Sequence, residues 1–214
     1  MRTRLTLLIS LLLLWGGSLY NVHAQVNIGV KADESGIKEF YLAIGDHYKA
    51  PEKEVIIVKE RGIPDDDLPV VFFLSKRAGV SPGVIIDLHL GGKSWMDITF
   101  HYGLTAEIYY VEVAKVKGPP YGKAYGHFKN KPKKDWKTIK LVDADIVNFV
   151  NLRFLSEHYG HSPDEIISMR SKGESFAKIN AKVKKARQNQ KQKKMTTAKS
   201  VKAKSAGKAK EKKK

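Results

Sequence analysis

The chain has 214 residues, no cysteine and a formal net charge of +17, which leaves room for one domain with appendages. The lack of cysteine excludes disulfides and thiolate metal sites, so an apolar core must stabilise the fold. Of the +17, the segment Lys182–Lys214 supplies +14, and Arg2 and Arg4 supply +2, which leaves +1 for residues 25–181. The basic character therefore belongs to the C-terminal segment, and any argument from net charge concerns that segment alone.

The first 24 residues have the pattern of a secretory signal peptide. Two arginines precede the apolar run Leu5–Trp15, and a polar stretch then ends in small residues at Ala24. As a helix the run would be about 16 Å long, against a hydrocarbon core of about 30 Å, so it is too short to remain as a membrane span. We expect cleavage near Ala24-Gln25, a periplasmic or secreted mature chain without a transmembrane span, and a flexible N-terminus at 25–36. The alternatives are an uncleaved anchor and a buried N-terminal helix.

A segment of the chain occurs twice, at 65–104 and at 143–183, with a constant offset of 81 residues. The first copy contains Phe73-Leu74-Ser75, Gly79, Ser81-Pro82, Ile85-Ile86, Gly92, Ser94-Trp95 and Ile98; the second contains Phe154-Leu155-Ser156, Gly160, Ser162-Pro163, Ile166-Ile167, Gly173, Ser175-Phe176 and Ile179. Glycine suits the left-handed residue after a helix, and serine before proline suits the start of the next helix. Each copy is therefore predicted to be helix, glycine turn, short helix, glycine turn and helix. A fainter copy covers Asp46–Gly62, and His101-Tyr102-Gly103 opens a degenerate fourth.

Polar residues at the predicted helix starts are interpreted as caps. Ser162 and Glu165 have the spacing of a capping box. Asp65-Asp66-Asp67 and Asp143-Ala144-Asp145 precede the first helix of the two strong copies, where acids favour the helix N-terminus. The aspartates lack the alternating spacing and the glycine of a calcium loop, so we expect caps and not metal ligands.

The predicted fold is mainly α: tandem helix-turn-helix-like units in one small domain, residues 37–181, with at most a minor β element around Val55 or Ile108. The β-forming residues near Ile108 lack the clean alternation of a strand. The residues expected in the core are Phe73, Leu74, Ile85, Leu88, Trp95, Ile98, Phe154, Leu155, Ile166, Met169, Phe176 and Ile179.

Residues 115–140 are rich in Gly, Pro, Lys and aromatic residues, which predicts a long irregular connection between the strong copies. Aromatic rings interleaved with lysines stack on ring ligands and pair with anionic groups. The candidate contacts are Tyr121, Tyr125, Lys129, Lys133, Lys134 and Trp136. The alternative is that the aromatic residues simply cover the helical core.

The segment 182–214 contains no aromatic residue, and Lys, Ala, Gln and Ser dominate it. Such a composition buries too little apolar surface to offset its conformational entropy, so we expect a disordered tail that extends the last helix by a turn or two. The predicted polyanion-binding residues are Lys184, Lys185, Arg187, Lys191, Lys193, Lys194, Lys199, Lys202, Lys204, Lys208, Lys210, Lys212, Lys213 and Lys214. The alternative is a tail that only confers solubility.

The sequence contains no arrangement of residues typical of an enzyme. His47, His101 and His158 recur at one repeat position, each beside a tyrosine, which indicates packing because a catalytic residue is needed once. We therefore predict no catalytic, cofactor-binding or metal-binding residues and no cofactor. An envelope enzyme with a site near His127 and Trp136 is the alternative.

The strings Gly79–Ile98 and Gly118–Gly126 resemble a group of exported bacterial proteins of unassigned function, and the similarity would cover roughly residues 37–183. That resemblance implies no activity and no residue roles. The Gly-x-Ser-Pro helix pairs also resemble helix-turn-helix DNA-binding proteins. We expect an exported interaction or scaffold protein whose tail binds acidic envelope polymers or anionic membrane surfaces; the alternative is a nucleic-acid-binding protein of helix-turn-helix type.

Overall fold

The structure, a computed structural model, describes residues 23–115 and 118–211, with side chains from 36 to 115 and from 118 to 197. All regular elements in these ranges are helices, and none is a strand. The predicted mainly α fold is therefore confirmed. The two places where a minor β element was allowed are helical as well, since Val55 lies in α2 (Glu52–Glu60) and Ile108 in the short 3-10 helix η2 (Ala106–Tyr109).

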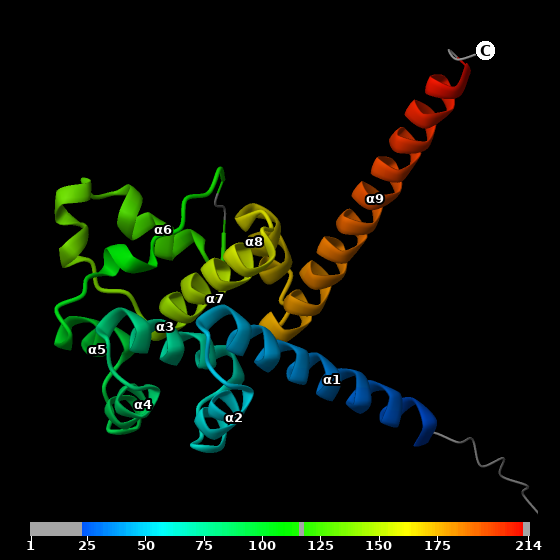
Figure 1. The fold of residues 1–214 in the computed structure, drawn as a ribbon. Coiled ribbons are helices and arrows are strands. Elements are labelled where there is room, and N and C mark those ends of the chain that lie inside the picture. The colour runs from blue at the N-terminus through cyan, green and yellow to red at the C-terminus, as the bar shows by residue number, and fades with distance from the viewer. Residues whose placement is uncertain (1–22, 116–117, 212–214) are drawn as a thin grey trace, which may run out of the picture.

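The other elements follow in chain order (Figure 1): α1 (His23–Tyr48), η1 (Asp65–Asp67), α3 (Leu68–Ala78), α4 (Pro82–Leu90), α5 (Trp95–His101), α6 (Gly122–Lys129), η3 (Lys133–Thr138), α7 (Asp143–Tyr159), α8 (Pro163–Ser171) and α9 (Phe176–Glu211). Helix α7 lies at the centre and contacts α1, α3, α5, α8 and α9. The two long helices α1 and α9 contact each other near the body and then project from it in different directions (Figure 1).

The two strong copies have the same succession of helices and turns. Helices α3 and α7 end at left-handed glycines, Gly79 with φ of 70° and Gly160 with φ of 65°. The short helices α4 and α8 begin with proline after a serine in extended conformation. A second glycine with positive φ follows each short helix, Gly92 at 94° and Gly173 at 83°. The repeat predicted from the 81-residue offset is thus present in the backbone.

The fainter copies also have helical counterparts. Helix α1 ends before Lys49, which has a φ of 61°, and α2 follows and stops before Gly62, with φ of 93°. Helix α3 is therefore the third helix of this unit and the first of the next. In the fourth copy Gly103, with φ of 68°, ends α5, but only the four-residue helix η2 follows.

The predicted capping box at Ser162 and Glu165 is wrong. No side chain caps α8, and Oε2 of Glu165 instead lies 2.7 Å from Nε2 of His161. A complete capping box occurs at α5, where Oγ of Ser94 accepts from the backbone N–H of Asp97 at 3.1 Å and the Asp97 carboxylate accepts from the backbone N–H of Ser94. Ser81 and Ser162 have extended backbone dihedral angles, but their side chains make no hydrogen bond to the helix N-terminus. They therefore set the backbone direction at the helix start without capping it.

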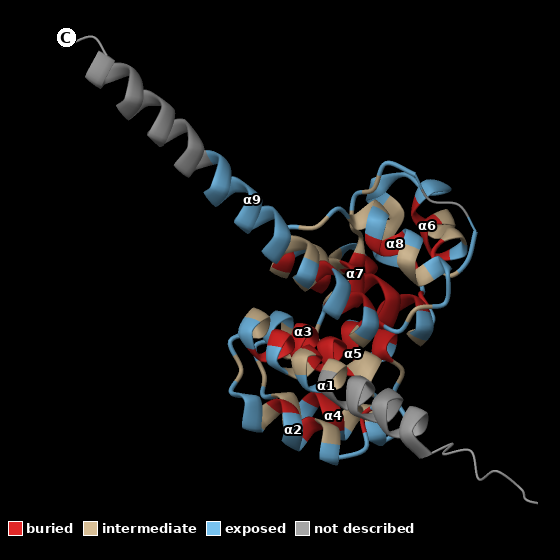
Figure 2. Ribbon diagram, turned by 90° about the vertical axis from the view of Figure 1, so that its right-hand side faces the viewer, coloured by how far each residue is buried: buried red, intermediate tan, exposed pale blue. Residues whose placement is uncertain are grey.

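The core is formed mainly by α3, α5 and α7, where buried residues cluster (Figure 2). Ten of the twelve residues predicted to be buried are buried, and the other two, Leu88 and Met169, are half-buried against the same core. The largest buried side chain is that of Trp95, at 0 % exposure. Burial of such aromatic side chains is the main favourable term in folding.

The described backbone begins before the predicted start of the domain. Residues 25–36, for which a flexible N-terminus is predicted, lie on the helical backbone of α1; residues 1–22, most of the expected signal peptide, lie outside the described residues. The C-terminal half of α1 buries Phe40, Ala43 and Ile44. This packing nucleates a helix, which then extends toward the N-terminus one hydrogen bond per residue.

The connection at 115–140 is more regular than predicted, since it contains α6 and η3. The buried residues Tyr121, Ala124, Tyr125 and Phe128 have the spacing i, i+3, i+4, i+7 of an amphipathic helix. An irregular connection was predicted because the glycines and prolines on either side of this pattern are typical of loops. Residues 116 and 117 lie outside the described ranges.

Helix α9 continues far beyond the predicted end of the domain, to Glu211. The packed start of the helix serves as a nucleus, and Lys, Ala and Gln propagate a helix well. Across the described ranges, no single helix is both long and apolar enough to cross a membrane; only the bent pair Asp65–Ala78 and Pro82–Leu90 meets the test, by length and composition.

Candidate functional site

The first turns of α9 belong to the folded body. Val183 is 1 % exposed and packs in the core. Nζ of Lys184 pairs with the carboxylate of Glu39 on α1, and the guanidinium of Arg187 donates to the backbone carbonyl of His158. Two of the predicted polyanion-binding residues therefore hold α9 against α1 and α7, and the packed domain extends past the predicted boundary at Ala181.

From Gln188 onward α9 projects from the body as a single helix (Figure 1), here named the basic extension, residues 188–211. Lys191, Lys193 and Lys194 are exposed in it, as is Lys185 just before it. Lys199, Lys202, Lys204, Lys208 and Lys210 lie on its helical backbone. Lys212, Lys213 and Lys214 lie outside the described residues.

The exposed lysines of the basic extension do not share one face of the helix. At 100° per residue, Lys191, Lys193 and Lys194 lie at three different angles around the helix axis. A helix that is polar all round has no face to pack against a core. Its 24 residues span about 36 Å, which suits contact with an extended polymer or surface rather than a closed pocket.

In the 118–140 region the aromatic candidates are structural. Tyr121 is 0 % exposed, and its hydroxyl donates to the backbone carbonyl of Asn148 at 3.3 Å. The Tyr125 hydroxyl donates to the carbonyl of Val111 at 2.7 Å. Nε1 of Trp136 donates to the carbonyls of Phe128 and Lys131, each at 3.1 Å. The interpretation that these rings cover the helical core fits these contacts.

The lysines of the same region are exposed, and one pocket adjoins them. Lys129, Lys133 and Lys134 face solvent, with Nζ of Lys133 5.7 Å from the ring of Trp136. Lys129 and Trp136 also line a cavity of about 460 Å³ together with Tyr110, Val113, Ala114, Gly122, Tyr125, Gly126 and Phe128. The residues predicted from the sequence therefore do lie close together, but most of the aromatic rings pack in the core and only the lysines are exposed.

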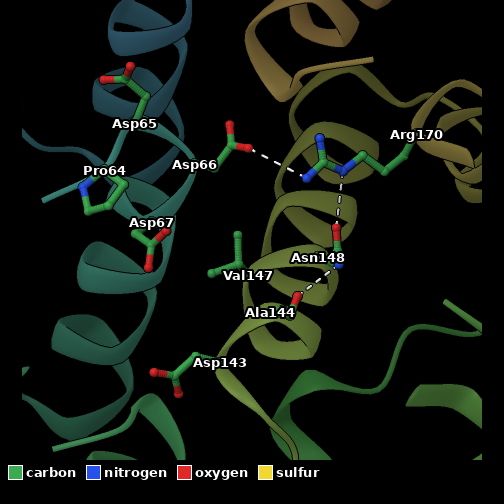
Figure 3. A pocket seen from close by; sticks show the side chains of 9 residues that line it. All are labelled: Pro64, Asp65, Asp66, Asp67, Asp143, Ala144, Val147, Asn148 and Arg170. Atoms are coloured by element: carbon green, nitrogen blue, oxygen red, sulfur yellow. Dashed lines mark hydrogen bonds and ion pairs between the residues drawn. The ribbon is translucent and has the colours of Figure 1, made fainter. Parts of the chain in front are cut away.

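An acidic pocket of about 590 Å³ lies between the starts of α3 and α7 (Figure 3). Its lining residues are Pro64, Asp65, Asp66, Asp67, Asp143, Ala144, Val147, Asn148 and Arg170. The Asp66 carboxylate lies 3.6 Å from the guanidinium of Arg170, whose Nε donates to Oδ1 of Asn148 at 3.2 Å. Burial raises the pKa values of Asp66 and Asp67 above the ordinary value, while Arg170 opposes the rise at Asp66 and the Trp95 indole opposes it at Asp67.

These aspartates are caps, but not of the helices that follow them in sequence. No side chain caps the start of α3 or of α7. Oδ1 of Asp143 accepts the backbone N–H of Trp95, the first residue of α5, at 2.8 Å. The Asp66 carboxylate lies beside the backbone N–H of Phe176, the first residue of α9, which opposes the rise in the pKa of Asp66. Each strong copy thus supplies an acid to the positive N-terminus of the last helix of the other copy.

Within the described side chains, no group of three or more His, Asp or Glu residues has an arrangement that holds a metal ion. The aspartates of the acidic pocket are instead satisfied by protein donors. Tyr41 donates to Oδ1 of Asp65 at 2.5 Å, and Nε1 of Trp95 donates to Oδ2 of Asp67 at 2.9 Å. The pocket therefore joins the two copies, and its charges have structural partners.

The angle between the helices agrees with a helix-turn-helix motif, but the second helices do not offer the free basic side chains that such a motif uses to contact DNA. The segment Asp65–Ala78 and α4 meet at 118°, in the range of such motifs. However, the basic groups on the second helices are engaged. His89 stacks on Trp95 with ring centroids 3.7 Å apart, and Arg170 lies 4.3 Å from the ring of Phe176. This leaves Lys93 and Lys172 as exposed cations beside α4 and α8.

The recurring histidines share one packing geometry. Each lies edge-on to the tyrosine that follows it, with centroid distances of 4.6 Å for His47–Tyr48, 4.9 Å for His101–Tyr102 and 4.5 Å for His158–Tyr159. Burial lowers the pKa of His47 to about 4 and also lowers the pKa of His158. The repetition fits the packing role predicted for these residues.

Comparisons with protein-family models, with curated proteins and with solved structures find no match to this chain. Function is therefore inferred from the geometry and charge of this molecule. The feature with the clearest functional chemistry is the basic extension, because Lys191, Lys193 and Lys194 are exposed in it and the extension lies outside the packed body.

Proposed function

We propose that this chain is an exported interaction protein that binds acidic polymers or anionic membrane surfaces through the basic extension. The observation that carries the proposal is the separation of charge in space. Residues 25–181 have a net charge of +1, whereas residues 188–214, which begin with the projecting part of α9, supply +10 of the net +17. Lys184 and Arg187, which contact the body, are removed from the proposed binding residues.

Electrostatic attraction to a polyanion supplies the affinity. Each lysine that neutralises a phosphate or carboxylate releases a condensed counterion, so the affinity falls steeply as salt rises. An anionic membrane attracts each nearby Lys by about 1 kcal/mol. Since the exposed lysines do not share one face of the helix, we expect little preference for polymer sequence and a strong dependence on charge density.

The contacts of α9 with the body define a truncation that tests the role of the extension. Truncation after Gln190 removes every lysine of the extension but keeps Val183, Lys184 and Arg187, whose contacts hold α9 to the body, so we expect the fold to be preserved. A matched control replaces Lys191, Lys193, Lys194, Lys199, Lys202, Lys204, Lys208 and Lys210 by Gln, which keeps helix propensity and removes charge. Binding of the three proteins to anionic vesicles, neutral vesicles, acidic glycan and duplex DNA is measured over a salt series.

We expect the intact chain to bind the anionic targets at low salt and both altered chains to lose at least tenfold in affinity. Equal binding by all three proteins would contradict the proposal. Tight binding to duplex DNA alone would instead favour the helix-turn-helix alternative. The mass of the mature chain isolated from cells tests export, because it shows at which residue the chain begins. A chain that begins near Gln25 supports export, and a chain that begins at Met1 opposes it.

A further inference from the structure

The cavity of about 460 Å³ beside α6 lies between that helix, η3 and the segment 110–114 that follows η2. Its volume lies within the range of about 300–1,000 Å³ found for small-molecule sites. None of its lining residues belongs to the basic extension, so the cavity is independent of the proposed function. The lining residues are Tyr110, Val113, Ala114, Gly122, Tyr125, Gly126, Phe128, Lys129 and Trp136.

One face of α6 forms a wall of this cavity. Four lining residues have the spacing i, i+3, i+4 and i+7 that places them on one side of a helix: Gly122, Tyr125, Gly126 and Lys129. The Tyr125 hydroxyl donates to the carbonyl of Val111 at 2.7 Å, which holds the neighbouring segment beside the helix. The two glycines carry no side chain, so this wall presents helix backbone at two positions one turn apart.

The fold itself gives no reason for glycine at position 126. Gly126 lies inside α6, where glycine is less favourable than alanine. Its φ is not in the left-handed region that requires glycine, unlike that of Gly160. A Cβ atom at Gly126 would meet no atom within 4 Å, so no packing contact excludes a side chain. Because Gly126 lines the cavity, the feature that its lack of a side chain does serve is open space, which lets a ligand approach the backbone closely.

Two accessible aromatic rings face the same space. Tyr110 and Trp136 both line the cavity and are only half-buried. Their ring centroids lie 4.7 Å apart with the planes at 44°. The indole N–H of Trp136 donates to the backbone carbonyls of Phe128 and Lys131, so this ring is held in place. Rings that are already fixed contact a further aromatic ring with little loss of conformational entropy.

The charge at the cavity is positive. Lys129 carries the one charge among the lining residues, all of which the structure describes. It is exposed and makes no ion pair with any described side chain. The carboxylate of Asp164 does not line the cavity and instead accepts the backbone N–H groups of Ala114 and Lys115, at 3.3 and 3.1 Å. A single cation at an aromatic cavity suits a ligand with one acidic group.

We propose that this cavity binds a small aromatic acid. The ring of the ligand lies against the backbone at Gly126 and contacts Tyr110 and Trp136, and its carboxylate pairs with Lys129. The wall without side chains and the two fixed rings favour a flat aromatic ring over a saturated one. Lys129 favours the acid over the corresponding neutral alcohol.

The test is a calorimetric titration of the full-length protein with benzoate. Two further probes each lack one feature, since benzyl alcohol has the ring without the charge and cyclohexanecarboxylate has the charge without the aromatic ring. We expect benzoate to saturate one site and the other two probes to bind about tenfold more weakly. Lys129→Gln should weaken the binding of benzoate and leave that of benzyl alcohol unchanged. The eight-lysine Gln variant of the extension is expected to keep benzoate binding; its loss there, or equal affinity for benzoate and benzyl alcohol, would contradict the proposal.

Gly126→Ala separates a binding role from a structural one. Alanine favours the helix, so this variant should unfold at a higher temperature, whereas the added methyl group should weaken benzoate binding about tenfold. Gly36→Ala is the matched control, because Gly36 lies in α1, away from the cavity, and a Cβ there also meets no atom within 4 Å. It should gain stability and keep benzoate binding. The proposal is overturned if benzoate does not saturate a single site, or if Gly126→Ala binds benzoate as the unaltered chain does or unfolds at a lower temperature.

Discussion

The backbone N–H of Trp95 donates to Oδ1 of Asp143 at 2.8 Å, across 48 residues of sequence. Trp95 opens the last helix of the first strong copy, and Asp143 opens the first helix of the second. On the other side, the backbone N–H of Phe176, the first residue of α9, lies beside the Asp66 carboxylate and opposes the rise in its pKa. The two copies therefore complete each other's helix starts, and neither is a self-sufficient unit.

Replacing Asp143 by Ala should lower the free energy of unfolding by about 1–2 kcal/mol, because the N-terminus of α5 loses a charged acceptor. Asp66→Ala is expected to behave similarly through α9. Glu112, which is exposed and has no side-chain partner among the described residues, serves as the control. Urea unfolding measures all three, and an equal loss in Glu112→Ala would contradict the capping role.

Replacing Trp95 by Ala should cost about 3–5 kcal/mol, because it empties a fully buried site. Trp95→Phe should cost less, since a ring remains, but the Asp67 carboxylate loses the indole donor. Thermal unfolding followed by circular dichroism measures both changes. A loss below about 1 kcal/mol in Trp95→Ala would mean that this side chain is not part of the core.

The serines at two helix starts should differ in their energetic effect. Ser94→Ala removes the acceptor for the backbone N–H of Asp97 and should cost about 1 kcal/mol. Ser162→Ala should cost far less, because the Ser162 side chain makes no cap bond. Chemical denaturation of the two variants gives the comparison directly. Equal losses would show that sequence position alone, and not the observed bond, determines the effect.

Acid should destabilise the protein through His47. The pKa of this imidazole is about 4 when folded, against an ordinary value of 6.5, so between these values the unfolded chain binds more protons. The stabilising contribution is complete above pH 6.5 and is lost as the pH falls to about 4. The part-exposed ring limits the loss to about 1–2 kcal/mol.

His47→Phe provides the comparison for this effect, because it keeps an aromatic ring beside Tyr48 and Phe154 without a titrating group. Free energies of unfolding are measured at several pH values from 7 to 4 for both proteins. The unaltered chain is expected to lose more stability than the variant over this interval. Parallel pH profiles would contradict the assignment.

Local signals in the sequence were sufficient to predict the repeated helices. Gly79 and Gly160 predicted helix ends because few other residues adopt positive φ cheaply. The i, i+3, i+4, i+7 pattern from Tyr121 to Phe128 was present as well but lay among glycines and prolines. The same pattern also explains why the rings of 118–140 are internal, since a helix with an apolar face packs against the core.

Contacts distant in sequence were not predictable in this way. The sequence placed Asp66 and Asp143 at helix starts, but the helices that they cap follow from the pairing of the two copies. The pocket lined by Tyr48, Arg77 and Arg153 likewise forms only where three helices meet. Nothing in the spacing of these residues along the chain indicates that they converge.

Helix α9 is a single rod that starts inside the body and ends outside it. Its first residue, Phe176, is fully buried, whereas Lys191, Lys193 and Lys194 further along it are exposed to solvent. Because α9 is one helix along its described length, an anionic surface that binds its outer part, as proposed, would set the orientation of the whole domain. Binding would then fix which face of the domain is turned toward other molecules.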